Sequence, residues 1–239
     1  MADIRWSSEF DRDKLLAAGL SDFDSFWNLE QSGATAEYKP VRQHYDRKTG
    51  RMKKQTTIVR INKIRYYLKR ASGDSYKFLK NEFETLKILP DFGLNTAKLL
   101  AYCLDDQDKR GFLLYKSLSG YNSLEELNGL RAQPEAIASF KVHKKDILRN
   151  IASAVNAIHH AGYFYPDWVA GHIFIRKGSQ EVVLIDLERF VHLKKCPWYY
   201  KYRVIRNYAR MKEWRKIRTA LGSKMYTRKF LNRLLREKN

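Results

Sequence analysis

Strand-like patterns gather in the first half of this chain of 239 residues, and helix-like patterns gather in the second half. Runs rich in β-branched, aromatic or other apolar residues predict four strands, at 56–61, 65–70, 99–104 and 112–116. Asn62-Lys63 separates the first two runs, which therefore predict a hairpin. Beyond Lys116, apolar residues at helical spacing in 146–160 predict a long amphipathic helix that stops at Gly162. Segregated strands and helices predict an α+β fold, because alternating βαβ units would interleave them.

The same pattern predicts a bilobal plan with two domains joined near 116–120. Residues 1–116 are expected to form a small, β-rich N-lobe, and residues 117–239 a helical C-lobe that ends in basic helices from Trp198 onward. Shorter patterns predict helices at 11–18, 75–89 and 123–127, and strands at 26–29, 173–175 and 182–185. Asp91-Phe92-Gly93 follows Pro90 and is interpreted as a turn.

Positive charge is concentrated in two blocks. The chain carries 46 Lys and Arg against 26 Asp and Glu, a formal net charge of +20. Residues 39–80 hold 14 basic and 2 acidic side chains, and residues 194–239 hold 16 basic and 2 acidic ones. Such blocks attract nucleic acid, anionic lipid headgroups or a phosphorylated substrate, and charge alone does not choose among these.

Several classes of protein are disfavoured by composition. The two cysteines, Cys103 and Cys196, are too few for a disulfide framework. No apolar run reaches the length of a membrane span, and the first residues lack the basic-then-apolar pattern of a signal peptide. We therefore expect a soluble, cytoplasmic protein.

Two carboxylates lie at the positions where a protein-kinase-like fold has its catalytic and metal-binding aspartates. Asp167 follows the long helix by several residues, and Asp186 directly follows the apolar strand 182–185. In protein kinases, a catalytic-loop Asp accepts the proton of the substrate hydroxyl and a second Asp, in the next loop, binds magnesium. The spacing predicts Asp167 as the catalytic residue and Asp186 as the principal Mg²⁺ ligand.

The first half supplies the cationic partner. Lys69 ends a predicted strand and Glu82 lies on the following helix, as in the lysine–glutamate pair that holds the phosphates of ATP. Lys69 and Glu82 are therefore predicted to bind the cofactor, although Arg65 and Arg70 are close competitors. We expect Lys69, Asp167 and Asp186 to converge around the terminal phosphate of one nucleotide.

These residues resemble the bacterial lipopolysaccharide kinases, which phosphorylate heptose or Kdo of the inner core. The similarity lies in His172 five residues after Asp167, in Tyr66-x-x-Lys69-Arg70, in Glu82-Phe83 with Leu89, and in Ile185-Asp186-Leu187-x-Arg189. The resemblance is closer to the heptose-kinase branch, because His rather than Asn stands five residues after the catalytic Asp.

The resemblance implies ATP and Mg²⁺ as cofactors and a sugar hydroxyl of a lipid-linked core oligosaccharide as the acceptor. It also implies action at the inner face of the inner membrane, where the basic blocks would meet an anionic surface. No nucleic-acid partner is expected.

The chain departs from the protein-kinase pattern at several positions. Tyr165-Pro166 replaces the usual His-Arg, and no G-x-G-x-x-G occurs, so the phosphate-covering loop is predicted within 39–54 instead. His172 occupies the position of a metal-binding Asn. It is predicted to bind the metal or cofactor, although imidazole suits Mg²⁺ poorly and the ring could order the loop instead. Two alternatives therefore stay open: a pseudokinase that binds without transferring phosphate, and a basic nucleic-acid-binding protein.

Overall fold

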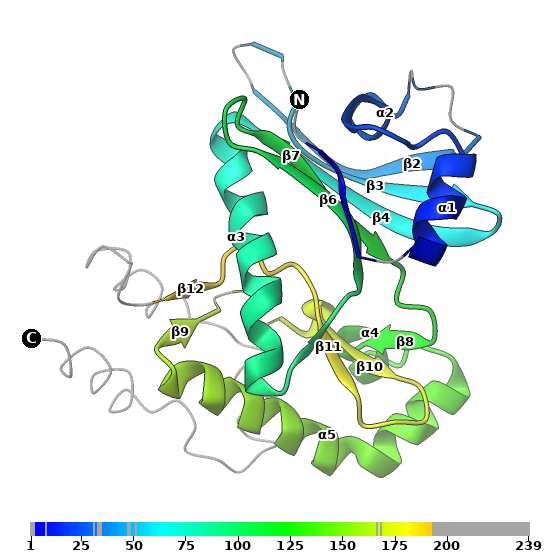
Figure 1. Cartoon of the computed structure of the whole chain (residues 1–239). Coiled ribbons are helices and arrows are strands. Elements are labelled where there is room, and N and C mark those ends of the chain that lie inside the picture. The colour runs from blue at the N-terminus through cyan, green and yellow to red at the C-terminus, as the bar shows by residue number, and fades with distance from the viewer. Residues whose placement is uncertain are drawn as a thin grey trace, which may run out of the picture. The chain divides into compact units, whose positions relative to one another are not determined.

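The computed structural model describes most of the chain up to residue 192 (Figure 1). The described residues are 3–7, 9–30, 32, 35–46, 49–50, 52–165, 167 and 169–192. The basic block at 194–239 and its expected helices lie outside them, as does Pro166.

The chain divides into two compact units. The first comprises residues up to Glu84 together with Ala97–Ser119, and the second comprises Thr85–Thr96 and the residues from Gly120 onward. The fold contains both helices and sheets, and its sheet-rich part is N-terminal, as the sequence predicts. The functional division at 116/117 stays a prediction, because residues 85–96 group with the second unit. None of the helices among the described residues is long and apolar enough to span a bilayer.

The first unit is built on a six-stranded sheet in the order β1-β6-β7-β4-β3-β2, in which every pair is antiparallel. Its strands are β1 (Arg5–Trp6), β2 (Glu37–Tyr45), β3 (Met52–Ile61), β4 (Ile64–Ser72), β6 (Leu99–Asp105) and β7 (Arg110–Lys116). Its helices are α1 (Glu9–Ala17), α2 (Phe23–Trp27) and the larger part of α3 (Tyr76–Ile88).

The predicted hairpin is confirmed as β3–β4. Its two-residue turn places Asn62 and Lys63 at φ 49° and 66°. Two successive left-handed residues make a turn whose twist matches that of the flanking strands. The range 39–54, where the phosphate-covering loop was placed, includes most of β2 and the start of β3. That placement stays a prediction.

Alternation along β4 sends neighbouring side chains to opposite faces of the sheet. Tyr66 and Leu68 are fully buried in an apolar core that includes residues of α1, α2 and β7. Lys69 lies on the other face, which α3 covers, as the ring contact of Phe83 with Tyr102 of β6 shows. Because the side-chain period of a strand is two residues, Lys69 and Arg70 cannot serve the same face.

Arg70 is a structural cation. Its side chain is 1% exposed, and it donates hydrogen bonds to the backbone carbonyls of Phe26 and Trp27 and to Gln55 Oε1. Burial is the largest influence on its pKa and lowers it. A buried charge is stabilised by such hydrogen bonds. Through its two Nη atoms, Arg70 joins α2 to the sheet, and its burial makes it unavailable for a ligand.

The expectation of a strand at 26–29 is wrong, because residues 23–27 form the short helix α2. Asp22 caps it: its Oδ1 accepts a hydrogen bond from the Ser25 amide at 2.8 Å, and Ser25 Oγ accepts one from the Asp22 amide. The aromatic residues that suggested a strand instead pack inward, with Phe26 stacked on Phe112 at 4.6 Å between ring centroids. The local cap therefore prevails over β-propensity.

The second unit is built around α5 (Pro134–His160) and a four-stranded sheet in the order β5-β11-β10-β8. Its other elements are β5 (Asn95–Thr96), β8 (Tyr121–Ser123), α4 (Leu124–Asn128), β9 (Tyr163–Phe164), β10 (Ile173–Arg176), β11 (Val182–Leu184) and β12 (Val191–His192). The helix α5 begins twelve residues before the predicted start at Asp146, because Pro134 occupies its first turn, where a missing N–H costs nothing.

Two strand pairs enclose the segments that carry the predicted carboxylates. The strands β10 and β11 are antiparallel, with Ile173 opposite Leu184, and β9 pairs with β12, with Phe164 opposite Val191. The loop 165–172 therefore starts beside the end of the loop 185–190, and it ends beside that loop's start. Both loops are held at both ends, so they must run next to each other.

Replacing Arg70 by Met is expected to lower the free energy of unfolding by about 3 kcal/mol, because the carbonyls and Gln55 that it satisfies would stay buried without a donor. Urea denaturation measures this change. Arg65→Met, at an exposed position of the same strand, is the matched control and should change stability little. Equal losses in the two variants would contradict the structural role of Arg70.

Candidate active site

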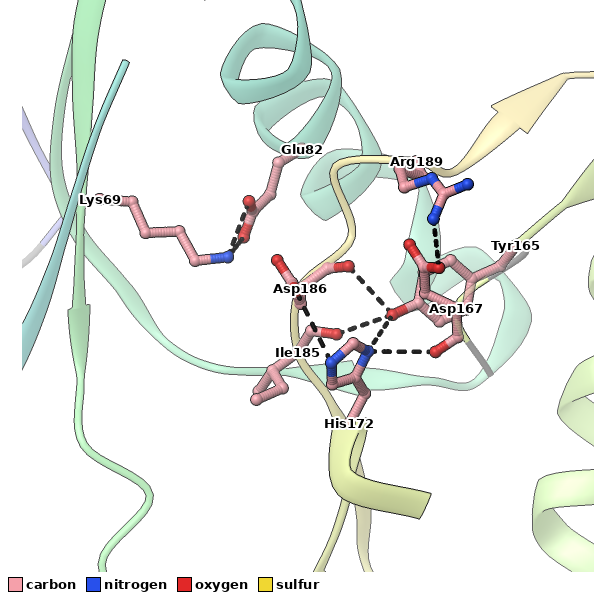
Figure 2. Close-up of polar contacts among 8 residues, drawn as sticks. All are labelled: Lys69, Glu82, Tyr165, Asp167, His172, Ile185, Asp186 and Arg189. Atoms are coloured by element: carbon pink, nitrogen blue, oxygen red, sulfur yellow. Dashed lines mark hydrogen bonds and ion pairs between the residues drawn. The ribbon is translucent and has the colours of Figure 1, made fainter. Parts of the chain in front are cut away.

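In the first unit, Lys69 and Glu82 form the predicted ion pair. Lys69 Nζ lies 2.8 and 2.9 Å from the two carboxylate oxygens of Glu82 (Figure 2). Lys69 extends from β4 and Glu82 from α3, and the side chains are 13% and 4% exposed. A lysine held in this way keeps one extended rotamer, so its ammonium is a fixed point charge rather than a mobile one.

Tyr115, which no sequence pattern singled out, also contacts Glu82. Its hydroxyl donates to Glu82 Oε1 at 2.9 Å, and Lys69 Nζ lies 5.9 Å from the centre of its ring. Tyr115 of β7 pairs with Tyr67 of β4, which puts it on the same sheet face as Lys69. This contact depends on the register between paired strands, so no local sequence pattern predicts it.

In the second unit, Asp167 lies in the loop between β9 and β10 and is bound by Arg189 from the facing loop. Arg189 Nη1 donates to Asp167 Oδ1 at 2.8 Å (Figure 2). The Asp167 side chain is 18% exposed, whereas that of Arg189 is 43% exposed. The guanidinium of Arg189, the more exposed partner, thus binds one of the two carboxylate oxygens of Asp167.

Opposing effects act on the pKa of Asp167. Burial is the largest of them and raises this pKa above its ordinary value, with smaller upward contributions from the charges of Asp186 and Glu188. Electrostatic interactions with Arg189 and His172 lower it in part. The net shift is upward. A carboxyl with a raised pKa is a better proton acceptor than an ordinary exposed one, which suits a general base.

Asp186 adopts an unusual backbone conformation. It lies two residues beyond the end of β11 and has φ 60°, in the left-handed region that residues with a side chain seldom occupy. Its neighbour Leu187 is 1% exposed and fixes the chain in the core of the second unit. The Asp186 carboxylate, 20% exposed, is thereby set at the edge of that core.

His172 orders the loop and faces Asp186. Its Nδ1 lies 3.1 Å from the backbone carbonyl oxygen of Asp167, which can only accept, so Nδ1 must carry a proton. Its Nε2 points to Asp186 Oδ2 at 3.6 Å. In the neutral ring, Nε2 is then the nitrogen with the lone pair.

Tyr165 joins the two loops, and the sequence noted it only as a departure from a known pattern. Its hydroxyl lies 2.9 and 3.0 Å from the carbonyl oxygens of Ile185 and Asp186, and 3.3 Å from His172 Nδ1 (Figure 2). The side chain is fully buried and packs in the same core as Phe190. Tyr165, Asp167 and His172 in one loop thus contact Ile185, Asp186 and Arg189 in the other.

The chemistry of the donors in this unit fits a hard divalent cation. Asp186 and Glu188 each offer a carboxylate oxygen, and these oxygens lie within 4.8 Å of each other. Carboxylate oxygen is the donor that Mg²⁺ prefers, and imidazole nitrogen is not. The set therefore favours Asp186, with Glu188, as ligands for Mg²⁺, and it favours a loop-ordering role for His172 over the predicted role as a metal ligand.

Comparison with known proteins places the chain in a family. A model described as the lipopolysaccharide kinase (Kdo/WaaP) family matches residues 30–198. Among solved structures, the fold is similar to one described as "WaaP in complex with acyl carrier protein", with 18% sequence identity and a TM-score of 0.57 over 98% of this chain and 95% of that one. None of the curated protein sequences matches.

The pKa of Asp167 is expected to lie above the usual range for aspartate and to rise further in Arg189→Gln, because the variant removes the largest influence that lowers it. Carboxyl-carbon NMR titration of the protein labelled at aspartate measures both values. Arg176→Gln, which removes an exposed arginine bound to Glu181 in the same unit, should leave the titration of Asp167 unchanged. An unshifted midpoint in Arg189→Gln would contradict the effect assigned to the pair.

Proposed function

The chain belongs to the lipopolysaccharide kinase (Kdo/WaaP) family. From that premise we propose that it is an ATP-dependent kinase that phosphorylates a hydroxyl group of heptose in the lipopolysaccharide inner core. In this proposal, residues 1–116 and 117–239 are the N-lobe and C-lobe of a bilobal kinase-like protein. The observation that carries it is the pair of adjoining loops in the second unit, where Asp167 and Asp186 are fixed by side chains of the facing loop.

Asp167 is proposed as the catalytic residue. The acceptor hydroxyl oxygen attacks the γ-phosphorus of ATP, its bond to phosphorus forms as the bond from the γ-phosphorus to the ADP oxygen breaks, and the hydroxyl proton passes to the Asp167 carboxylate. Arg189 occupies Oδ1 of Asp167, which leaves Oδ2 as the oxygen for the acceptor. Its raised pKa assists proton uptake but also requires a pH high enough to keep the carboxylate ionised.

Asp186, with Glu188 beside it, is proposed to hold the Mg²⁺ that accompanies ATP. When bound, this ion neutralises charge on the phosphate oxygens as the bond to the leaving group breaks. His172 is proposed to act on the same site from its fixed place between Asp167 and Asp186. Its ring keeps the catalytic loop in register with the loop that carries Asp186.

Lys69 is proposed to bind the phosphates of ATP. Glu82 and Tyr115 hold the ammonium in one position, so the ordering of a long, flexible side chain is complete before ATP binds. Arg70, the competing cation from the sequence, is excluded from this role because it is buried on the opposite face, where it binds the carbonyls of α2 and Gln55.

Family membership and charge support the proposed substrate and location. Heptose is favoured over Kdo by the resemblance at His172, and a lipid-linked core oligosaccharide would be met at the inner face of the inner membrane. The net charge of +20 suits both the phosphates and carboxylates of such a substrate and an anionic membrane surface. A pseudokinase is the principal alternative, and the experiment on phosphate transfer below separates the two.

Incubation with labelled ATP, Mg²⁺ and dephosphorylated core oligosaccharide is expected to place one new phosphate on a heptose, which mass spectrometry locates. Asp167→Asn should reduce the rate by at least roughly a hundredfold, because general-base catalysis contributes about that much. Asp146→Asn, at an exposed position of α5, is the control. Phosphate on Kdo would correct the substrate, and ATP binding without any transfer would identify a pseudokinase.

Asp186→Ala is expected to abolish the Mg²⁺-dependent part of ATP binding, because it removes the proposed principal ligand of the ion. Isothermal titration calorimetry with ATP, in the presence and absence of Mg²⁺, measures this part directly. Asp146→Asn again serves as the control and should bind as the parent does. Unchanged Mg²⁺ dependence in Asp186→Ala would remove Asp186 from the proposed site.

A further inference from the structure

We propose that one exposed side of α5, here named the α5 stripe, is a docking surface for an anionic lipid bilayer. The inference deepens the proposed function, because it rests on the proposed location at a membrane and names the part of the chain that makes the contact. Three observations carry it: the exposure of the stripe, its apolar and basic chemistry, and the partners of the charges around it. The stripe consists of Pro134, Ala138, Lys141, Val142, Lys145 and Arg149.

The α5 stripe lies on the side of the helix that faces away from the core. Phe140, Ile147 and Ile151 are buried in the apolar core of the second unit, and β10 and β11 lie to one side of α5 (Figure 1). Because an α-helix turns once in 3.6 residues, the stripe falls on the opposite side. All six of its residues are exposed, and Val142 is 77% exposed, more than any other large apolar residue in the described part of the chain.

The stripe carries apolar side chains where a solvated helix normally carries polar ones. Pro134, Ala138 and Val142 follow one another at four-residue intervals, so they form a row on the surface. The other side of the same turns is also apolar, because Ala136 and Phe140 are buried there in the core. A helix that is apolar on both sides is normally covered on both, whereas this side is exposed. The row therefore favours a partner outside the chain.

The charges along the first half of α5 leave lysines available to that partner. Of the two acidic residues in 134–149, Glu135 is paired with Lys177 Nζ at 3.6 Å. The other, Asp146, is paired with Arg149 Nη1 at 2.9 Å. Each lysine near an anionic bilayer raises the affinity roughly fivefold. Within the part of the chain that the structure describes, three lysines of the same span have no ion pair: Lys141, Lys144 and Lys145.

The chemistry of the stripe favours lipid over a protein partner. Interfaces between proteins are enriched in aromatic residues and arginine and depleted in lysine. The stripe contains no aromatic residue, and its one arginine already binds Asp146. Lysine stems lie along apolar surface while their ammonium groups stay in the polar layer, so Lys141 and Lys145 can reach lipid phosphates on either side of a shallowly inserted Val142. An anionic bilayer fits both the apolar row and the lysines.

The test compares two double variants of the full chain that remove the same charge. Lys141→Gln/Lys145→Gln alters the stripe, whereas Lys98→Gln/Lys109→Gln alters exposed lysines of the first unit that lie outside both basic blocks. Sedimentation with vesicles of equimolar phosphatidylcholine and phosphatidylglycerol measures the affinity. It should fall roughly tenfold or more in the stripe variant and stay within about twofold of the parent in the control. Equal losses in both variants, or a parent that does not bind, would overturn the proposal.

A fluorescent probe reports whether the stripe itself enters the bilayer. Val142→Cys and, as the control, Lys98→Cys are labelled with a polarity-sensitive dye in a chain that also carries Cys196→Ser, since the remaining cysteine, Cys103, is buried. On addition of the anionic vesicles, the emission of the label at 142 should shift to shorter wavelength, and that of the label at 98 should not. Vesicle binding without this shift would overturn the proposal and assign the contact to another surface. A shift with duplex DNA but not with vesicles would identify a nucleic-acid surface instead.

A soluble acceptor separates this proposal from the proposed function. On delipidated core oligosaccharide, Lys141→Gln/Lys145→Gln should transfer phosphate within about twofold of the parent rate, because the stripe is not part of the proposed catalytic machinery. A parent that transfers no phosphate would contradict the proposed function, whereas the vesicle comparison would still confirm or overturn the docking surface. An active parent whose stripe variant binds vesicles equally well would leave the function standing and would overturn the docking surface.

Discussion

The arrangement of the second unit depends on two strand pairs that close the same two loops. The strands β9 and β12 pair at one end, and β10 and β11 pair at the other. Once both pairs form, the loops 165–172 and 185–190 have fixed ends and little freedom to separate. Arg189 can then reach Asp167, and the Tyr165 hydroxyl can reach the carbonyl of Asp186. Backbone pairing thus brings together carboxylates that are 19 residues apart in sequence.

The first unit uses the alternation of a strand to separate two adjacent cations. Lys69 faces α3 and pairs with Glu82, whereas Arg70 faces the opposite core and satisfies backbone carbonyls of α2. The two cations therefore have different roles. One orders a partly accessible ammonium, and the other fixes a helix on a sheet. Charge and neighbourhood in the sequence are the same for both residues, and only the face of the sheet distinguishes them.

The polar groups of the second unit show how burial and charge are balanced around Asp167. Burial raises its pKa, and the arginine that bonds to it opposes that rise only in part. His172 contributes in another way, because its protonated Nδ1 is bound to the Asp167 carbonyl and its Nε2 faces the Asp186 carboxylate. These groups form a connected network in which each side chain has a partner in the facing loop, and such networks specify one arrangement when all members are satisfied.

The sequence by itself determined the order of the elements and the identity of the main polar groups. It predicted the β3–β4 hairpin, α3 and the strands β6, β7, β10 and β11, because apolar periodicity and turn residues are local properties. The pairing of Lys69 with Glu82 was predicted from the lysine–glutamate pattern of protein kinases. It failed at 26–29, where the Asp22–Ser25 cap makes a helix, and at the start of α5, where Pro134 was not recognised as a first-turn residue.

Tertiary structure decided what depends on partners distant in the chain. Only the fold shows that Tyr115 holds Glu82, that Arg189 binds Asp167, and that Tyr165 bonds to the backbone on either side of the Ile185–Asp186 bond. No local pattern encodes these contacts, since each arises from the register of strands that pair across many residues. A hydrogen bond needs its atoms within about 3 Å, and that placement is fixed by packing rather than by spacing along the chain.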